Sequence, residues 1–281
     1  MEIINLIILV IIFIITINLI FGYNEEYTEI NQTNLTVSTN DSDYFKKFSQ
    51  ANIISKLYNN NRLTIPVNKK NKILFITYDN RYVEEYIKVH NYNINKYVEK
   101  YGYKYIYYNK CNENVYWCKI YMVLDALKKN LYDYVCWLDS DTIIKNFDID
   151  IGNIINMFTS DIFIGSDNNS KFDLTNSGVF IIKNSEIGQK FLTDCIGWVN
   201  SGCINNDGTL KGKWAGSCYE QGVMNILIAD KYSKYTTVLT NSVIFNYNVC
   251  SNDVFIMHLY ASPAHYRVNC FNSKNPALKQ A

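Results

Sequence analysis

From Lys72 onward, short apolar segments alternate with amphipathic segments of helical length, and this alternation constrains the fold more than any other feature of the chain. The predicted strands cover residues 72–78, 103–109, 133–144, 161–167, 177–185 and 254–260. The predicted helices cover residues 81–102, 115–130, 186–200 and 218–234, and Gly102 is expected to cap the first of them. Alternating strands and helices favour an α/β fold with a mainly parallel sheet covered by helices. Such sheets bind ligands beyond the carboxyl ends of their strands.

Several nucleotide-binding classes lack their signatures in this chain. No GxGxxG motif follows the first strand and no GxxxxGK[ST] motif is present, so neither a Rossmann-type dinucleotide site nor a P-loop is supported. The 27 Lys and Arg residues balance 26 Asp and Glu residues, and the formal net charge of +1 gives no general electrostatic reason to bind nucleic acid. Hydrophobic residues make up 48% of the chain, which is enough for a substantial core.

The N-terminal segment has the composition of a membrane anchor. Residues 3–21 carry no charge, and a helix of about 20 apolar residues spans the hydrocarbon core of a bilayer. The acidic start at Glu2 and the length of the run favour an uncleaved signal-anchor transmembrane helix over residues 1–21, with a buried helix as the alternative. Residues 22–45 are polar, and residues 22–65 are expected to form a stem. A folded domain is expected over residues 66–281.

Sequons and cysteines favour a lumenal position for the folded domain. Three N-x-S/T sequons begin at Asn31, Asn34 and Asn40, close to the expected anchor, and a fourth begins at Asn168. The eight cysteines form no CxxC pair, which argues against a zinc ribbon or a thioredoxin-like site. Cys136 lies inside an apolar strand and is expected to be a buried thiol. Some of the others are expected to pair in an oxidising compartment, with a connectivity that the sequence leaves open.

The strand predicted over 133–144 runs into an acidic turn. Asp139 and Asp141 are two residues apart at the exit of the apolar segment YVCWL, so their carboxylates can converge on one divalent cation. Such a cation would neutralise a departing diphosphate and act as a Lewis acid. The other two DxD triplets, which begin at Asp41 and Asp148, do not follow a buried strand. The simpler alternative is that Asp139 only caps the segment that follows.

His258 is a candidate for a third ligand. It lies in the apolar segment VFIMHLY, where a histidine is either a hydrogen-bonded core residue or a metal ligand. Together with Asp139 and Asp141 it would form an oxygen and nitrogen ligand set that suits Mn²⁺, with Mg²⁺ as the alternative.

Seven segments occur in an order that resembles glycosyltransferase family 34. They are KILFITYDNRY, HNYNINKYVEKYGY, WCKIYMVLDAL, YVCWLDSDTII, TNSGVFIIKNS, YEQG and FIMHLY, and they span residues 72–261. The resemblance implies a single Rossmann-like nucleotide-sugar-binding domain of the GT-A type, preceded by a transmembrane helix and a stem. It also implies Mn²⁺-dependent, retaining transfer of a hexose or pentose to a glycan acceptor. The donor would be a nucleotide-diphosphate sugar of the UDP-Gal, UDP-Xyl or GDP-Man class.

The resemblance also implies roles for individual residues. The implied metal ligands are Asp139, Asp141 and His258. The implied donor-binding residues are Thr77, Tyr78, Asp79, Trp117, Lys119, Asp139, Ser140, Asn176, Ser177 and Gly178. The implied catalytic residues are Glu220 and Gln221. Without the resemblance, turn chemistry would account for Asn176 and Gly178. The acidic first turn of a helix would account for Glu220, and a solvated helix face for Lys119.

Members of family 34 often carry a basic residue after the histidine that contacts the diphosphate, and this chain departs from that pattern. It continues as LYASPAHYR, which leaves Arg267 or His265 as substitutes, or a diphosphate that is held less tightly. For retention we favour attack by the acceptor on the face that the nucleotide leaves, with electrostatic support from Glu220 and Gln221. Nucleophilic attack by Glu220 from the opposite face is the alternative.

The expected partners are a nucleotide sugar, a glycan acceptor, the membrane through residues 1–21, and other transferases in homo- or hetero-oligomers, but no nucleic acid. The expected location is that of a single-pass type II membrane glycoprotein facing the lumen of the ER or Golgi, or a host secretory membrane if the chain is viral. One rival function is a soluble nucleotidyltransferase, although no Gly-rich basic loop follows the first strand. The other is a non-catalytic membrane glycan-binding or scaffold protein on a transferase fold.

Overall fold

The computed structural model describes residues 70–81, 84–166, 175–199, 202–205, 207–239, 245–252 and 254–277, which all fall within one compact unit. The predicted signal-anchor over 1–21, the stem over 22–65 and the four sequons lie outside these residues. Within the described ranges, no helix is long and apolar enough to cross a membrane. The anchor, the stem and the glycosylation therefore stay predictions.

The first half of the folded domain consists of parallel strand–helix–strand units. Its elements are β1 (Ile73–Tyr78), α4 (Glu85–Tyr101), β2 (Lys104–Tyr108), α5 (Cys118–Lys128) and β3 (Tyr134–Leu138). β1 pairs in parallel with β2 on one side and with β3 on the other. Gly102 ends α4 in the left-handed conformation, with φ 72°, as predicted for its C-cap.

The main sheet is mixed but mainly parallel, which confirms the predicted α/β class. The other strands of this sheet are β5 (Ile162–Ser166), β6 (Thr175–Lys183) and β7 (Thr236–Leu239). The strand order is β2-β1-β3-β6-β5-β7, with β6 antiparallel to both neighbours and β5 parallel to β7. The register pairs Leu138 of β3 with Val179 of β6, so the start of β6 lies beside the carboxyl end of β3.

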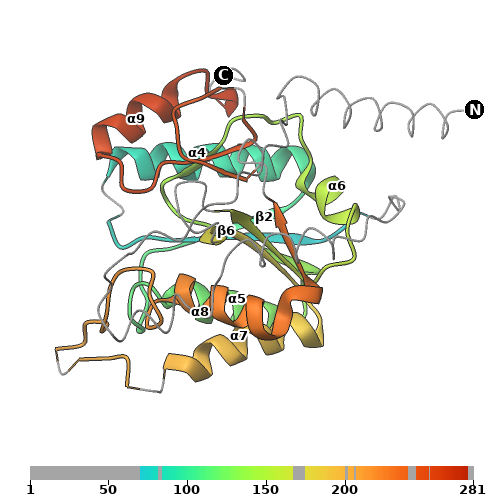
Figure 1. Cartoon of the computed structure of the whole chain (residues 1–281). Coiled ribbons are helices and arrows are strands. Elements are labelled where there is room, and N and C mark those ends of the chain that lie inside the picture. The colour runs from blue at the N-terminus through green and yellow to red at the C-terminus, as the bar shows by residue number, and fades with distance from the viewer. Residues whose placement is uncertain are drawn as a thin grey trace, which may run out of the picture. The chain divides into compact units, whose positions relative to one another are not determined.

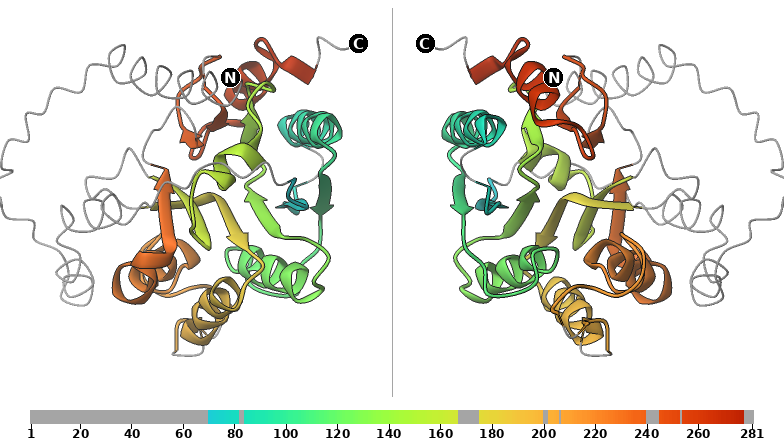
Figure 2. Two further views of the ribbon diagram at one scale, coloured as in Figure 1. Left: turned by 90° about the vertical axis from the view of Figure 1, so that its right-hand side faces the viewer. Right: turned by 90° about the vertical axis from the view of Figure 1, so that its left-hand side faces the viewer.

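Helices cover both faces of the main sheet. The helices not yet named are α6 (Ile151–Asn156), α7 (Glu186–Val199), α8 (Glu220–Leu227) and α9 (Ala264–Asn272). Figure 1 shows α4, α6 and α9 on one side of the sheet and α5, α7 and α8 on the other, and Figure 2 shows the same layers from two further directions. Alternate residues of β1 serve the two layers because Leu74 and Ile76 join one buried cluster while Ile73 and Phe75 join the other.

The structure divides the strand predicted over 133–144. β3 ends at Leu138, and Thr142–Ile144 form β4, which pairs antiparallel with β9 (Ile256–His258) in a second sheet of order β4-β9-β8. The third strand of that sheet is β8 (Phe245–Tyr247). The chain turns at Asp139, whose N–H donates to Gly178 O over 2.8 Å while its carbonyl accepts from Thr142 N over 3.0 Å. The acidic triplet is therefore the connection between the two sheets.

Two other expectations differ from the structure. The helix predicted over 218–234 is a regular α-helix only in α8, and a π-helical turn (Ile228–Tyr232) and a 3₁₀ turn (Ser233–Tyr235) follow it. The sequence also did not predict β7, β8, α6 or α9. Each of these has nine residues or fewer, which is too short for a clear periodic pattern.

Three disulfides join six of the eight cysteines. They are Cys111–Cys118, Cys203–Cys218 and Cys250–Cys270. Cys136 and Cys195 are buried thiols, which confirms the prediction for Cys136, and burial raises the pKa of both.

Candidate functional site

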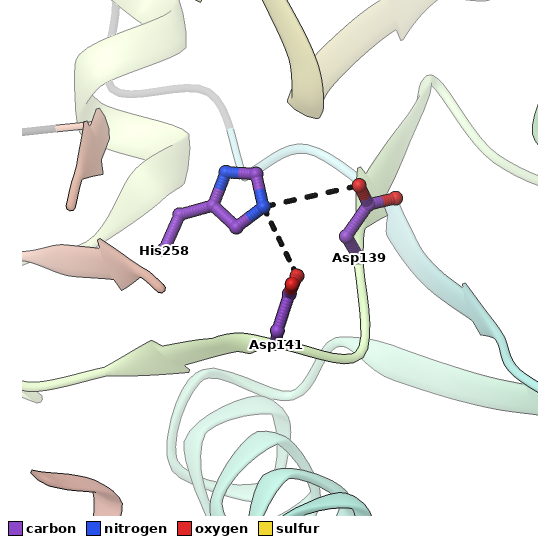
Figure 3. A group of neighbouring side chains, drawn as sticks. All are labelled: Asp139, Asp141 and His258. Carbon is purple, nitrogen blue, oxygen red and sulfur yellow. Dashed lines mark ion pairs between the residues drawn. The ribbon is translucent and has the colours of Figure 1, made fainter. Parts of the chain in front are cut away.

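The two carboxylates of the acidic turn and the predicted histidine lie together. Asp139 follows β3, Asp141 precedes β4, and the register of the second sheet pairs His258 with Thr142. His258 Nε2 lies 3.0 Å from Asp141 Oδ1 and 3.9 Å from Asp139 Oδ2. One potential ligand atom from each of the three residues lies within 4.8 Å of the others, and Figure 3 shows the imidazole facing both carboxylates. The structure thus brings the predicted ligand set to one point between the sheets.

The hydrogen bonds of Asn246 determine which imidazole nitrogen faces the carboxylates. Asn246 Nδ2 donates to Ser166 O over 2.8 Å, so its Oδ1 is the atom that faces His258 Nδ1, at 2.5 Å. A carbonyl oxygen can only accept, so Nδ1 carries a hydrogen and Nε2 is the ring atom that faces the two carboxylates. Acceptors that face one another in this way require a cation or a proton between them. The donor set therefore fits a divalent cation such as Mn²⁺ or Mg²⁺.

Gly178 makes room for this histidine. It lies inside β6, and a Cβ atom at this position would be 2.0 Å from Cε1 of the His258 ring. Asn176, two residues earlier in the same strand, accepts from Gly178 N–H over 2.8 Å. Both residues lie within β6 and not in a turn before it, although Asn176 bonds the N–H two residues on as in an Asx turn. Turn chemistry does not account for Gly178, whose lack of a side chain makes room for His258.

Arg267 forms a buried ion pair with Asp141. Its Nη2 donates to Asp141 Oδ2 over 2.8 Å, its Nε donates to Leu259 O over 3.0 Å, and its guanidinium lies 4.9 Å from the centre of the Tyr86 ring. Burial alone would raise the pKa of Asp141, but His258 and Arg267 beside it hold that pKa well below its ordinary value. Arg267 therefore orients a candidate ligand, whereas the sequence had offered it, with the exposed His265, as a diphosphate contact.

Lys119 lies between two carboxylates on the other side of Asp139. Its Nζ is 2.9 Å from Asp139 Oδ1 and 3.2 Å from Glu220 Oε1, and the residue is 8% exposed. Burial would lower the pKa of Lys119, but the two carboxylates outweigh that effect and raise it. Ser177 completes the cluster because its Oγ donates to Glu220 Oε1 over 2.9 Å and its N–H donates to Gln221 Oε1 over 3.1 Å. A solvated helix lysine is thus wrong for Lys119, and Glu220 is both a first-turn residue of α8 and a buried ion-pair partner.

The candidate donor-binding residues of β1 are held by internal contacts. Thr77 is buried, and its Oγ1 lies 2.9 Å from both Leu138 O and His90 Nε2. Asp79 pairs with Arg81 over 2.7 Å. It also accepts from the hydroxyl of Ser140.

The surroundings of Asp79, Tyr78 and Trp117 are also defined. Burial would raise the pKa of Asp79, but its hydrogen bonds from Arg81 and Ser140 lower it. Tyr78 is half-buried at the end of β1. Trp117 is buried and its Nε1 donates to Cys218 O over 3.1 Å, so it joins the start of α5 to the segment before α8.

Sequence reasoning missed Asn246, and it considered Arg267 only as a diphosphate contact and not as a partner of Asp141. Asn246 has φ 90° and belongs to β8, a strand that was not predicted. Because asparagine is abundant in this chain, a single asparagine does not indicate a site residue. For Arg267, the only available signal was its position nine residues after His258.

In sequence, the chain matches no protein-family model and no curated protein. In structure, 71% of the chain is similar to 98% of a glycosyltransferase involved in the glycosylation of the major capsid of PBCV-1, with a TM-score of 0.56 and 14% identity. The two chains share a fold. The glycosyltransferase GlyE of Streptococcus pneumoniae TIGR4 is similar over 75% of this chain and 63% of that chain at 12% identity, with a TM-score of 0.46 that is too low to add weight.

The structural similarity establishes a GT-A-like α/β architecture for the folded domain. It does not show that the chain belongs to glycosyltransferase family 34, and that narrower resemblance stays a prediction.

Proposed function

We propose that this protein is a metal-dependent glycosyltransferase that transfers a sugar from a nucleotide-diphosphate donor to a glycan acceptor. One observation carries the proposal. His258 directs Nε2 at the carboxylates of Asp139 and Asp141 at the carboxyl end of β3, in a fold shared with a glycosyltransferase. In open α/β sheets this edge is where ligands bind.

Asp139, Asp141 and His258 would hold the cation, which when bound supplies positive charge to a departing diphosphate. Arg267 fixes one oxygen of Asp141, and this leaves the other oxygen directed at His258 Nε2. Asn246 holds the imidazole in the tautomer that a cation requires. Both contacts position the ligand atoms before a substrate arrives.

Glu220 would give electrostatic support to the reacting sugar. Its Oε1 is already engaged by Lys119 and by the hydroxyl of Ser177, contacts that reduce its strength as a nucleophile. Gln221, whose Oε1 accepts from Ser177 N–H, is held in the same cluster. We therefore favour attack by the acceptor on the face that the nucleotide leaves, with the charge of Glu220 and the amide of Gln221 stabilising the positive sugar.

A lumenal, membrane-anchored location belongs to the same proposal. Its support is the uncharged run over residues 3–21 and the three disulfides, since disulfides persist in oxidising compartments. The narrower possibilities, retention and a donor of the UDP-Gal, UDP-Xyl or GDP-Man class, rest on the resemblance to family 34. A non-catalytic glycan-binding protein is the alternative function.

The test incubates the full-length protein with Mn²⁺ and, in turn, UDP-galactose, UDP-xylose, UDP-glucose and GDP-mannose, and measures released UDP or GDP. We expect turnover of one donor, its loss in EDTA, and a decrease on the order of a hundredfold in Asp139→Asn. Asp148→Asn is the matched control, because Asp148 belongs to another DxD triplet and its side chain is 92% exposed. Donor turnover that survives in Asp139→Asn would refute the metal site. Metal-dependent donor binding without turnover would indicate that the acceptor or a partner is required, whereas neither turnover nor donor binding would favour the non-catalytic alternative.

A further inference from the structure

The helices α5 and α8 both begin at the candidate site. Lys119 lies in the first turn of α5 and Glu220 is the first residue of α8, and their side chains meet 3.2 Å apart beside Asp139. The residues that precede these two helices therefore border the site. Those residues are Val115 and Tyr116 before α5, and the segment that ends at Tyr219 before α8.

A disulfide closes each of these preceding segments. Cys111–Cys118 closes the first loop and Cys203–Cys218 closes the second. The two loops also contact each other, since Trp117 Nε1 donates to Cys218 O over 3.1 Å and Asn114 Nδ2 donates to Gly208 O over 3.3 Å. The two disulfide loops, residues 111–118 and 203–218, thus form one covalently restrained surface beside the candidate site.

Aromatic side chains are exposed on this surface. Tyr116 is 38% exposed and Trp214 is 60% exposed. Four of the nine large hydrophobic side chains exposed in the described part of the chain lie in the disulfide loops, namely Val115, Tyr116, Ile204 and Trp214. Exposed apolar groups that gather on one surface mark interaction sites.

The positions of Tyr116 and Trp214 are fixed relative to the site. The ring of Tyr116 contacts that of Tyr219 edge-on, with centroids 4.9 Å apart, and Tyr219 immediately precedes Glu220. The turn that follows Trp214 lies on the first turn of α8, because a Cβ atom at Gly222 would be 2.0 Å from Gly216 O. The ring of Tyr116 therefore contacts the residue before Glu220, and the turn after Trp214 packs against the first turn of α8.

We propose that the disulfide loops bind the glycan acceptor and that sugar rings stack on Trp214 and Tyr116. This inference deepens the proposed function and rests on it for the identity of the reaction. A sugar ring has an apolar C–H face and hydroxyl groups at its edge, so it suits aromatic rings interspersed with polar side chains. The second loop has that composition, since the exposed residues Asn205, Asp207 and Lys211 lie in the same loop as Trp214. A continuous apolar surface would instead suit a membrane or a protein partner.

The test measures binding of the full-length protein, without donor, to an array of hexose, pentose and N-acetylhexosamine oligosaccharides. Soluble forms of any glycan that binds are then titrated. We expect Trp214→Ala and Tyr116→Ala each to weaken binding about tenfold, with most of the affinity kept in Trp214→Phe and Tyr116→Phe, because a phenyl ring preserves stacking. The matched controls are Leu131→Ala and Tyr92→Ala, which remove exposed apolar side chains elsewhere, 62% and 41% exposed, and should bind as the wild type does. Thermal unfolding of each variant verifies that it is folded.

Every outcome bears on the proposal. Loss of glycan binding in the two alanine variants, but not in the controls, supports it. Unchanged binding in those variants, or no glycan bound by the wild type, overturns it. Because binding is measured without donor, a wild type that turns over donor but binds no glycan refutes only the acceptor surface. A wild type that binds glycan through Trp214 but releases no nucleotide refutes only the proposed transfer.

Discussion

Arg267 and Asp141 form a largely buried ion pair in which Nη2 lies 2.8 Å from Oδ2, while the other oxygen of Asp141 lies 3.0 Å from His258 Nε2. The two oxygens of the Asp141 carboxylate thus have different partners. The arginine side holds the group in place, and the histidine side faces the position that a cation would occupy. This division makes the contribution of Arg267 separable from that of the ligands.

Replacing Arg267 by Met should lower the affinity for Mn²⁺ by about tenfold, because a residue that orients a metal ligand typically has an effect of that size or larger. Titration of free Mn²⁺ by electron paramagnetic resonance measures this directly, without substrate. Arg267→Lys should recover part of the loss. Lys100→Met, which removes a cation from the exposed pair with Asp148, should bind Mn²⁺ normally. An affinity in Arg267→Met equal to or above that of the wild type would show that relief of charge repulsion outweighs orientation.

Gly178→Ala should displace the imidazole of His258, because the added Cβ would lie 2.0 Å from Cε1 of the ring. We expect a fall in Mn²⁺ affinity of at least tenfold. Gly197→Ala is a matched control, since a Cβ at that position in α7 meets nothing within 4 Å. The control should be more stable than the wild type by about 0.5–1 kcal/mol, as for glycine inside a helix. Normal Mn²⁺ binding in Gly178→Ala would mean that His258 is not a ligand.

Lys119→Met should destabilise the folded protein by about 3–5 kcal/mol, because it leaves Asp139 and Glu220 beside each other without their shared cation. Chemical denaturation measures the change in the free energy of unfolding. Lys129→Met removes an exposed pair with Asp125 at the other end of α5 and should cost no more than about 1 kcal/mol. If the two variants were equally stable, the buried cluster would have no special energetic role.

His90 should make the protein less stable in mild acid. Burial lowers the pKa of His90 to about 4, and its Nδ1 donates to Thr142 O over 2.7 Å. The unfolded chain takes up this proton near pH 6.5, so between pH 6.5 and 4 the unfolded state binds more protons and stability falls as the pH falls. The loss from this group is at most roughly 3 kcal/mol.

The measurement for His90 is the free energy of unfolding as a function of pH. In His90→Gln the part of the slope between pH 4 and 6.5 that belongs to this group should disappear. His265→Gln removes an exposed histidine and should keep the slope of the wild type. An identical slope in His90→Gln would show that other groups cause the acid sensitivity.

The sequence was most informative where periodic segments were long. Apolar strands and long helical patterns located β1, α4, β3 and β6, and they supported the mainly parallel sheet. They could not show that the chain leaves the main sheet at Asp139, because the apolar residues of β4 continue the pattern of β3 across the turn. The three short strands of the second sheet are stable through their pairing with one another, which is a long-range property.

The candidate site was only partly visible for the same reason. Asp139 and Asp141 are two residues apart in sequence, so their convergence could be predicted from the triplet alone. Lys119 is buried with Glu220, which follows it by about a hundred residues. Taken alone, the lysine therefore favoured the alternative of a solvated helix face, which is wrong. The role of Asn246 depends on its left-handed backbone conformation, which a single sequence does not reveal.

The disulfide between Cys250 and Cys270 encloses both His258 and Arg267 in one covalent ring. During synthesis Asp139 and Asp141 leave the ribosome long before the residues of this ring, so both carboxylates lack His258, and Asp141 lacks Arg267, until the last part of the folded domain has been made. A chain shortened just after Tyr260 would keep all three candidate ligands. It would nevertheless leave Cys250 without its partner and Asp141 without its arginine, so the C-terminal helix supports the candidate metal site from outside the ligand set.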